Sequence, residues 1–168
     1  YIIVNPRIKE TKYPFKHLSG AGVTFKFIIA ALRELNNSLK DRFEKDYLTG
    51  LLDLVAVSTI SDLMPLVDEN RVIVKKGIDM IKRTKNQGLK EMVDTVLKNR
   101  GDINEYDIGF IIAPRLNAAG RIMNARSGLD LLSSTAGSKA GLLDDLNSFN
   151  EKRQDTQKKI FDEIIENN

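Results

Sequence analysis

The sequence predicts the α/β fold class: a mostly helical piece of a domain with a parallel sheet, ending in a long connector helix. Apolar residues recur at helical spacing in several segments between residues 23 and 165. The opening run, Tyr1 to Val4, has the continuous apolar character of a buried strand. A strand needs neighbours for its backbone hydrogen bonds, and the chain does not begin with Met. We therefore expect the partners of this strand upstream of Tyr1, in a longer protein.

The first half of the chain alternates loops with apolar segments. Pro6 fixes its own φ and lacks an N–H, so it ends the opening strand. A Gly-rich turn at 18–22 precedes apolar residues at helical spacing, which predicts a helix over 23–36. The other expected elements are a loop over 7–12, a buried helix or strand over 48–57, and a turn over 59–65.

The second half is predicted to be helical. The expected helices cover 70–81, 89–98 and about 127–132, and 141–168 forms one long helix or two. Residues 106–113 are helix-compatible until Pro114 interrupts them, and 117–121 form a compact loop of small residues. Residues 151–159 are almost wholly polar, which is typical of a solvent-exposed connector. We therefore divide the chain into a domain over 1–140 and a connector helix over 141–168 that leads to an absent second domain.

Composition excludes several classes of protein. The chain has 168 residues, 42% of them hydrophobic, which suffices for about one domain with a core. Its net charge of +3 is too small to indicate a nucleic-acid binder. The absence of cysteine excludes disulfides, thiolate zinc sites and cysteine nucleophiles. The longest apolar stretches, such as 27–32, are far shorter than the roughly 20 residues of a membrane-spanning helix. We expect a soluble, cytoplasmic protein without membrane contact.

Charge is more informative where it is concentrated. Residues 71–100 hold nine Lys and Arg against three Asp and Glu, a local surplus of 9 − 3 = +6. A basic stripe close to a Gly-rich turn suits a ligand that carries phosphate. A solvated helix face is the alternative explanation.

Asp62 is the candidate metal ligand. It follows an apolar segment directly, and a carboxylate at the end of a buried element can reach a hard cation. A turn-capping role is the alternative. Asp53, nine residues earlier, is a possible second ligand, although an N-cap role is equally compatible with its position. One or two carboxylates do not complete a metal site.

Two further segments are candidates for binding phosphate. Ser19, Gly20 and Gly22 precede a helix, whose free N–H groups and positive dipole end attract anions; a tight turn into the helix is the alternative. Arg115 and Arg121 flank the small-residue segment, and guanidinium groups bind phosphates through paired hydrogen bonds. Ion pairs or capped carbonyl groups would explain these arginines equally well. His17, the single histidine, has no nucleophile or base near it in sequence, which favours a structural or surface role.

Taken in order, these segments resemble the DHH phosphoesterases, and among them the RecJ-type single-strand-specific DNA exonucleases. The resemblance covers nearly the whole chain. It is carried by the following segments: Ile3 to Pro6, Tyr13 to Val23 with Phe25 and Lys26, Leu52 to Ala56, Thr59 to Leu66 with Glu69 to Arg71, Ile108 to Phe110 with Ala113 to Arg121, and Leu146 and Asn147 with Asn150 and Arg153.

The resemblance implies a phosphodiesterase that depends on Mn²⁺ or Mg²⁺. Asp62 matches the metal aspartate of the family's fourth motif, and the earlier motifs, including Asp-His-His, are expected before Tyr1. Arg115 and Arg121 would hold backbone phosphates of the entering strand, and Asn117 would order the loop or donate to the DNA. A single aspartate cannot assemble a metal pair, so the chain alone is expected to be inactive.

The implied activity is removal of nucleotides from single-stranded DNA, from the 5′ end, in repair and recombination. A single-strand-binding protein or a helicase is the expected kind of protein partner. Two alternatives remain open. One is a phosphodiesterase of the same superfamily that cleaves oligonucleotides or cyclic dinucleotides, and the other is a non-catalytic relative that binds nucleic acid.

Overall fold

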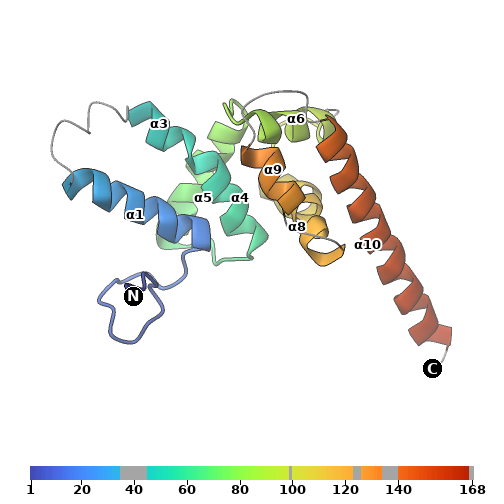
Figure 1. Ribbon diagram of the computed structural model, residues 1–168, viewed down its shortest axis with the longest axis horizontal. Helices are drawn as coiled ribbons and strands as arrows, with labels where there is room; N and C mark the ends of the chain where they lie inside the picture. Colours follow the sequence, from blue (N-terminus) through green and yellow to red (C-terminus); the bar gives the residue numbers. More distant parts are fainter. Residues whose placement is uncertain (35–44, 99, 123–125, 134–139, 167–168) are drawn as a thin grey trace. The chain divides into compact units, whose positions relative to one another are not determined.

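A computed structural model of the protein describes residues 1–34, 45–98, 100–122, 126–133 and 140–166. These residues form helices and no strand (Figure 1). The elements are α1 (Gly20–Glu34), α3 (Lys45–Gly50), α4 (Leu52–Ser61), α5 (Asp68–Ile81), α6 (Gln87–Val96), α7 (Glu105–Asp107), the π-helix η1 (Ile108–Ile112), α8 (Ala113–Ile122), α9 (Arg126–Ser133) and α10 (Ala140–Glu166).

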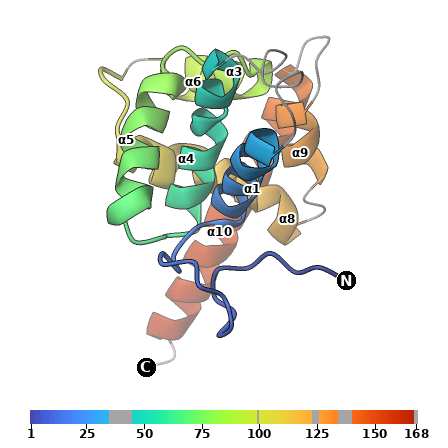
Figure 2. The same ribbon diagram turned by 90° about the vertical axis from the view of Figure 1, so that its left-hand side faces the viewer.

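The mostly helical character is confirmed, but the expected strand does not form. Residues 1–4 are extended and highly exposed, and Figure 2 shows this segment lying apart from any other extended segment. A strand is stable only when its backbone groups pair with a neighbour. The described part of the chain provides no such neighbour, so it contains no parallel sheet.

Most predicted helices are confirmed with shifted ends. α1 begins at Gly20 instead of residue 23, and its predicted end at residue 36 lies outside the described residues. α5 begins two residues earlier than predicted, and α6 covers Gln87–Val96 instead of 89–98. The turn predicted over 59–65 begins only at Asp62, because α4 extends to Ser61. In the described residues no helix is long and apolar enough to cross a membrane.

The chain forms two compact units. The first comprises residues 1–85 and 101–109, and the second residues 86–100 and 110–168. In the first unit α4 packs along α5, as Figure 2 shows, and also contacts α1 and α3. Its core includes Phe15, Leu18, Leu52, Val55 and Ile73.

α4 is the central helix of the first unit. Its buried residues are Leu52, Asp53, Val55, Ala56, Val57, Thr59 and Ile60, which surround the helix axis. A helix that is apolar on all sides is stable only when other elements cover it. This all-round burial explains why the sequence pattern over 48–57 suited a strand and a helix equally well.

Gly77 allows α4 and α5 to approach closely. A Cβ atom at this position would overlap the backbone carbonyl of Leu52 and the Cβ of Ala56. Helix axes come this close only where one side chain is missing at the crossing point. Gly77 therefore sets the distance between the two helices.

A buried hydrogen bond links the start of α4 to the chain that follows α5. Asp53 is only 4% exposed, and its carboxylate accepts hydrogen bonds from the Leu54 N–H and the Thr84 hydroxyl. Burial raises the pKa of Asp53, while the hydrogen bonds from Thr84 and Leu54 lower it to a smaller extent. The charged carboxylate is thus less stable in the folded protein than in the unfolded chain.

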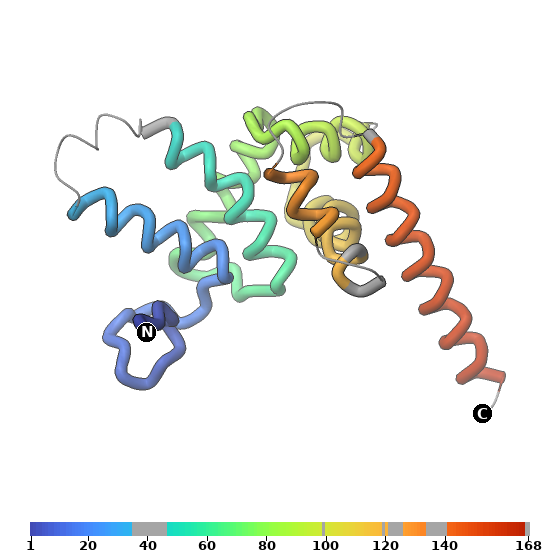
Figure 3. The backbone as a smooth tube through the Cα atoms, in the orientation of Figure 1, coloured from blue at the N-terminus to red at the C-terminus, as the bar shows by residue number. Residues whose placement is uncertain are grey.

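The second unit consists of α6, α8, α9 and α10. α10 packs against α8 and α9, and α6 packs against α9. Its most buried apolar residues include Leu89, Met92, Leu131, Leu143 and Leu146. The described residues of the segment over 141–168 form a single helix, α10 (Ala140–Glu166), which Figure 3 traces without interruption. Residues 151–159 of this helix are exposed except for the half-buried Arg153, as the polar pattern predicted.

The predictions for residues 106–121 are wrong in two respects. Pro114 does not interrupt the helical run but occupies the second position of α8, and residues 117–121 are helical, not a loop. η1 ends immediately before α8, and proline is tolerated in the first turn of a helix because its missing N–H would have no partner there. Of the small residues, Ala118 is fully buried and serves packing, whereas Gly120 is exposed.

Replacing Gly77 by alanine will lower the free energy of unfolding by about 1–3 kcal/mol, because α4 and α5 must move apart to admit the methyl group. Urea unfolding of the purified protein measures this change. Gly50→Ala is the control, because a Cβ there has nothing within 4 Å. Equal stability of the two variants would contradict the proposed close packing.

Asp53→Asn will make folding less sensitive to pH. The pKa of Asp53 in the folded protein lies above its ordinary value of 3.8, so the folded protein binds this proton more tightly than the unfolded chain does. The resulting contribution to the free energy of unfolding is fully present below pH 3.8 and is lost as the pH rises through the raised pKa. Asn has no charge to bury, so the stability of the variant relative to wild type will increase from pH 3.5 to pH 7. Urea unfolding at both pH values tests the sign, and a decrease would contradict it.

Candidate functional site

Asp62 occupies the C-cap of α4, at a sharp turn of the backbone. The next residue, Leu63, has a left-handed backbone with φ of 53°, and its N–H donates to the Ile60 carbonyl at 3.0 Å. The Met64 N–H donates to the Thr59 carbonyl at 3.1 Å. These two bonds form a Schellman motif, in which glycine is the usual left-handed residue. A leucine here keeps the same turn at a cost in backbone strain, so the direction of the chain at Asp62 is fixed.

The Asp62 carboxylate is exposed and accepts a long hydrogen bond from the Ser58 hydroxyl, at 3.4 Å. An exposed carboxylate oxygen is the kind of donor that Mg²⁺ and Mn²⁺ prefer. The described residues contain no group of three or more His, Cys, Asp or Glu that could hold a metal ion. Asp62 therefore fits a divalent cation as one ligand, and a complete site needs further ligands from elsewhere.

Asp53 does not join Asp62. The two residues are nine positions apart, near opposite ends of α4, which corresponds to about 13 Å along the helix axis. Asp53 is also not the N-cap, because Leu51 holds that position and Asp53 lies in the first turn. Both roles considered for Asp53 are therefore wrong, and its carboxylate serves the buried hydrogen bond to Thr84.

Ser19 caps the start of α1. Its hydroxyl accepts a hydrogen bond from the Gly22 N–H at 3.1 Å and lies 3.3 Å from the hydroxyl of Thr59. The Thr59 hydroxyl donates to the Val55 carbonyl at 2.7 Å, so Ser19 must be the donor between the two hydroxyls. Ser19 and Gly22 are buried, whereas Gly20 is exposed. This geometry matches the tight helix start that was the alternative to a phosphate-binding turn.

Asn70 was assigned no role in the sequence analysis, which includes it only within the segment Glu69 to Arg71 that carries the resemblance. It lies in the first turn of α5, is fully buried, and its amide nitrogen donates to the carbonyls of His17 at 2.7 Å and Pro65 at 3.0 Å. The helical spacing gives a signal that could have found it: position 70 begins the series of buried positions 70, 73, 74, 77, 78 and 81. A polar residue at the start of an apolar stripe indicates a buried hydrogen-bonding role.

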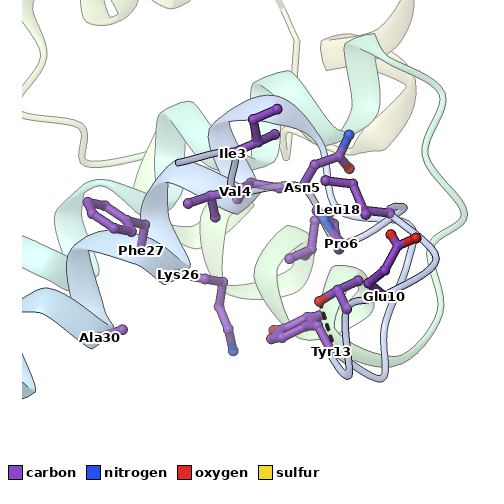
Figure 4. A pocket seen from close by; sticks show the side chains of 13 residues that line it. Ile3, Val4, Asn5, Pro6, Glu10, Tyr13, Leu18, Lys26, Phe27 and Ala30 are labelled. Carbon is purple, nitrogen blue, oxygen red and sulfur yellow. Dashed lines mark hydrogen bonds between the residues drawn. The ribbon is translucent and has the colours of Figure 1, made fainter. Parts of the chain in front are cut away.

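A cavity of about 500 Å³ lies beside α1 in the first unit, with largely apolar walls (Figure 4). Tyr13 and Lys26 line it. The Tyr13 hydroxyl donates to the Glu69 carboxylate at 2.8 Å, and the Lys26 ammonium lies 3.0 Å from the same carboxylate. Burial lowers the pKa of Lys26, but its contacts with Glu69 and Tyr13 outweigh burial and raise the pKa overall. Burial, followed by the Glu69 hydrogen bond, raises the pKa of Tyr13.

Arg115, in the second unit, connects α8 to α10. Its Nε–H donates to the Asn147 side-chain oxygen at 2.8 Å, and its Nη1 donates to the Ile111 carbonyl at 2.6 Å. Burial lowers the pKa of this guanidinium, and the charge of Glu151 opposes that effect. A bond to a backbone carbonyl group was the alternative to phosphate binding for Arg115. The two bonds use two of the five N–H groups of a guanidinium.

Asn117 is exposed on α8. Position 121 follows one helical turn later, so positions 117 and 121 share a side of the helix, whereas position 115 lies on another side. The side chain of Arg121 lies outside the described part of the structure. Asp62, Ser19, Gly20 and Gly22 belong to the first unit, and the three α8 residues to the second.

No protein-family model matches the chain. The single-stranded-DNA-specific exonuclease RecJ of Bacillus subtilis is 41% identical over 165 residues, which are 98% of this chain and 20% of that protein. The structure of RecJ from Thermus thermophilus in complex with Mg²⁺ superposes with a TM-score of 0.75 at 30% identity, covering 90% of this chain and 23% of that one. A structure of exonuclease RecJ bound to manganese gives a TM-score of 0.76 at 29% identity, over 93% of this chain and 38% of that one.

The chain thus spans about a fifth of the length of the B. subtilis protein. Sequence and fold similarity extend over nearly all of its residues and involve proteins with the same name. The chain belongs to the RecJ family and corresponds to one segment of those longer proteins.

Proposed function

We propose that this chain is part of a metal-dependent exonuclease that hydrolyses single-stranded DNA. The observation that carries the proposal is the 41% identity to a RecJ exonuclease over 98% of the chain. In this proposal residues 1–140 form the later part of the catalytic domain, and residues 141–168 connect it to a second domain. α10, a continuous helix with an exposed second half, supports the connector role.

Asp62 is proposed to hold a catalytic Mn²⁺ or Mg²⁺ ion. Its carboxylate is exposed, and its backbone is fixed by the turn after α4. The related RecJ structures are in complex with Mg²⁺ or bound to manganese, and either ion takes oxygen ligands. When bound, the ion would supply Lewis-acid stabilisation of charge on the scissile phosphate. The remaining ligands would come from the family's earlier motifs, including Asp-His-His, which are proposed to precede Tyr1.

The DNA backbone is proposed to contact α8. Asn117 and Arg121 share one side of this helix, where an exposed amide and a guanidinium can donate to phosphate oxygens. Arg115 holds α8 against α10 and keeps N–H groups for a phosphate. The turn at the start of α1 is also proposed to bind phosphate. Ser19 would hold this turn through the bond that its hydroxyl accepts from the Gly22 N–H, and the exposed Gly20 is the position that a phosphate can reach.

The wider role follows the same family resemblance. We propose degradation from the 5′ end, in DNA repair and recombination in the cytoplasm, with a single-strand-binding protein or a helicase as partner. Substrate length distinguishes this function from its alternatives. Continuous shortening of long single strands supports the exonuclease, cleavage limited to short oligonucleotides or cyclic dinucleotides supports a small-substrate phosphodiesterase, and binding without cleavage supports a non-catalytic relative.

Asp62→Asn in the full-length enzyme will reduce Mn²⁺-dependent hydrolysis of single-stranded DNA by at least about 100-fold, because one oxygen ligand loses its charge. Release of nucleotides from labelled DNA and Mn²⁺ calorimetry measure the two effects. Asp68→Asn is the matched control, since it removes an exposed carboxylate from the other end of the same loop. The 168-residue chain alone will show no hydrolysis. Full activity of Asp62→Asn would refute the proposed metal role.

Arg121→Ala will weaken binding to single-stranded DNA uniformly across sequences and reduce the slope of log affinity against log salt by about 1, the effect of losing one phosphate contact. Fluorescence anisotropy at several salt concentrations gives both values. Arg126→Ala is the matched control, because Arg126 is an exposed arginine on the neighbouring α9. An unchanged salt slope for Arg121→Ala would remove this residue from the DNA interface.

A further inference from the structure

Asn70 joins three segments of the first unit. Its amide nitrogen donates to the carbonyl of His17, which lies just before the α1 cap, and to the carbonyl of Pro65, three residues after Asp62. Asn70 itself belongs to the first turn of α5. One buried side chain therefore connects the approach to α1, the loop that carries Asp62 and the start of α5.

The orientation of this amide follows from its partners. Both partner atoms are carbonyl oxygens, which only accept hydrogen bonds, so the nitrogen of the amide must face them. The amide oxygen, Oδ1, is buried and has no hydrogen-bond partner among the described residues. A buried acceptor without a partner costs free energy, so the two bonds that the nitrogen donates are what Asn70 contributes to the fold. The function of Asn70 thus lies in holding two carbonyl groups of different segments.

The loop between α4 and α5 depends on this attachment. The loop lies between two residues with left-handed backbones, Leu63 at φ 53° and Asp68 at φ 45°. This conformation is unfavourable for leucine, although aspartate tolerates it better, and it persists at Leu63 only because surrounding contacts fix it. The Schellman bonds fix the loop at its start, and the bond from Asn70 to the Pro65 carbonyl fixes it further along. Thr59 contributes a third point, because its hydroxyl accepts from Ser19 and its carbonyl from Met64.

We propose that Asn70 is a positioning residue for the metal site: by holding the loop after Asp62, it keeps the Asp62 carboxylate where a divalent cation binds. This inference rests on the proposed function. Asn70 does not touch the cation. It acts through the Pro65 carbonyl and the three residues that separate Pro65 from Asp62.

The test compares two Asn70 variants with a matched control in the full-length enzyme. Asn70→Leu keeps the branched shape at Cγ in a larger side chain, carries no charge and lacks both donors, while Asn70→Ser keeps one donor in a smaller side chain. Thr84→Val is the control, because it removes a buried hydrogen bond, to Asp53, at the opposite end of the α4–α5 pair. The measurements are the Mn²⁺ dissociation constant by calorimetry, the Mn²⁺ concentration for half-maximal hydrolysis of single-stranded DNA, and the thermal unfolding temperature.

Asn70→Leu is expected to raise the Mn²⁺ dissociation constant and the half-maximal Mn²⁺ concentration by at least about 10-fold, as losing support for a ligand does. kcat at saturating Mn²⁺ will return towards the wild-type value. Thr84→Val will lower the unfolding temperature without changing the dissociation constant. Asn70→Ser will lie between wild type and Asn70→Leu, and it decides the question if the leucine variant does not fold.

Asn70 variants that destabilise the protein but bind Mn²⁺ as tightly as Thr84→Val would overturn the inference. The proposed function fails separately: wild-type enzyme that neither binds Mn²⁺ nor hydrolyses DNA removes the metal site itself. Where wild type is active and Asp62→Asn is not, the function stands, and the dissociation constants of the Asn70 variants alone decide their role.

Discussion

The close approach of α4 and α5 at Gly77 determines the geometry of the first unit. Because no side chain intervenes at the crossing point, the two helices are in contact through backbone and Cβ atoms. Polar side chains hold both ends of the pair: the Thr84 hydroxyl donates to Asp53 at one end, and at the other the Asn70 amide donates to the Pro65 carbonyl in the α4–α5 loop. The loop that carries Asp62 spans the second of these ends. The packing of these two helices therefore determines the position of Asp62, the candidate metal ligand.

Hydrophobic periodicity was sufficient to predict the helices that pack on one side only, because such a helix repeats its apolar residues at a spacing that is visible in the sequence. α5, α6 and α9 were predicted within about two residues at either end for this reason. The strand over residues 1–4 could not be predicted in the same way. Strand formation depends on a pairing partner, and an apolar run of four residues contains no information about whether that partner is near.

The same distinction between local and distant information applies to the polar residues. Asp62 was identified because a carboxylate directly after an apolar segment is visible in the sequence, and the exposure of its side chain agrees with that interpretation. The role of Asn70 was missed because it depends on two carbonyls, 53 and five residues away, which only the tertiary structure brings together. Pro114 and the small residues after it were misinterpreted as loop signals. The π-helix before them adjusts the backbone locally, and no pattern in the sequence indicates such a turn.

The second half of α10 has a consequence for the behaviour of the chain in solution. Beyond its polar middle, the helix carries Ile160, Phe161 and Ile165, each more than half exposed. Apolar side chains gathered on one helix face in water favour contact between copies of the molecule, independently of how stable each copy is. The last turns of α10 therefore favour association between copies of this chain, although Leu143 and Leu146 near the start of the same helix lie in the core of the second unit.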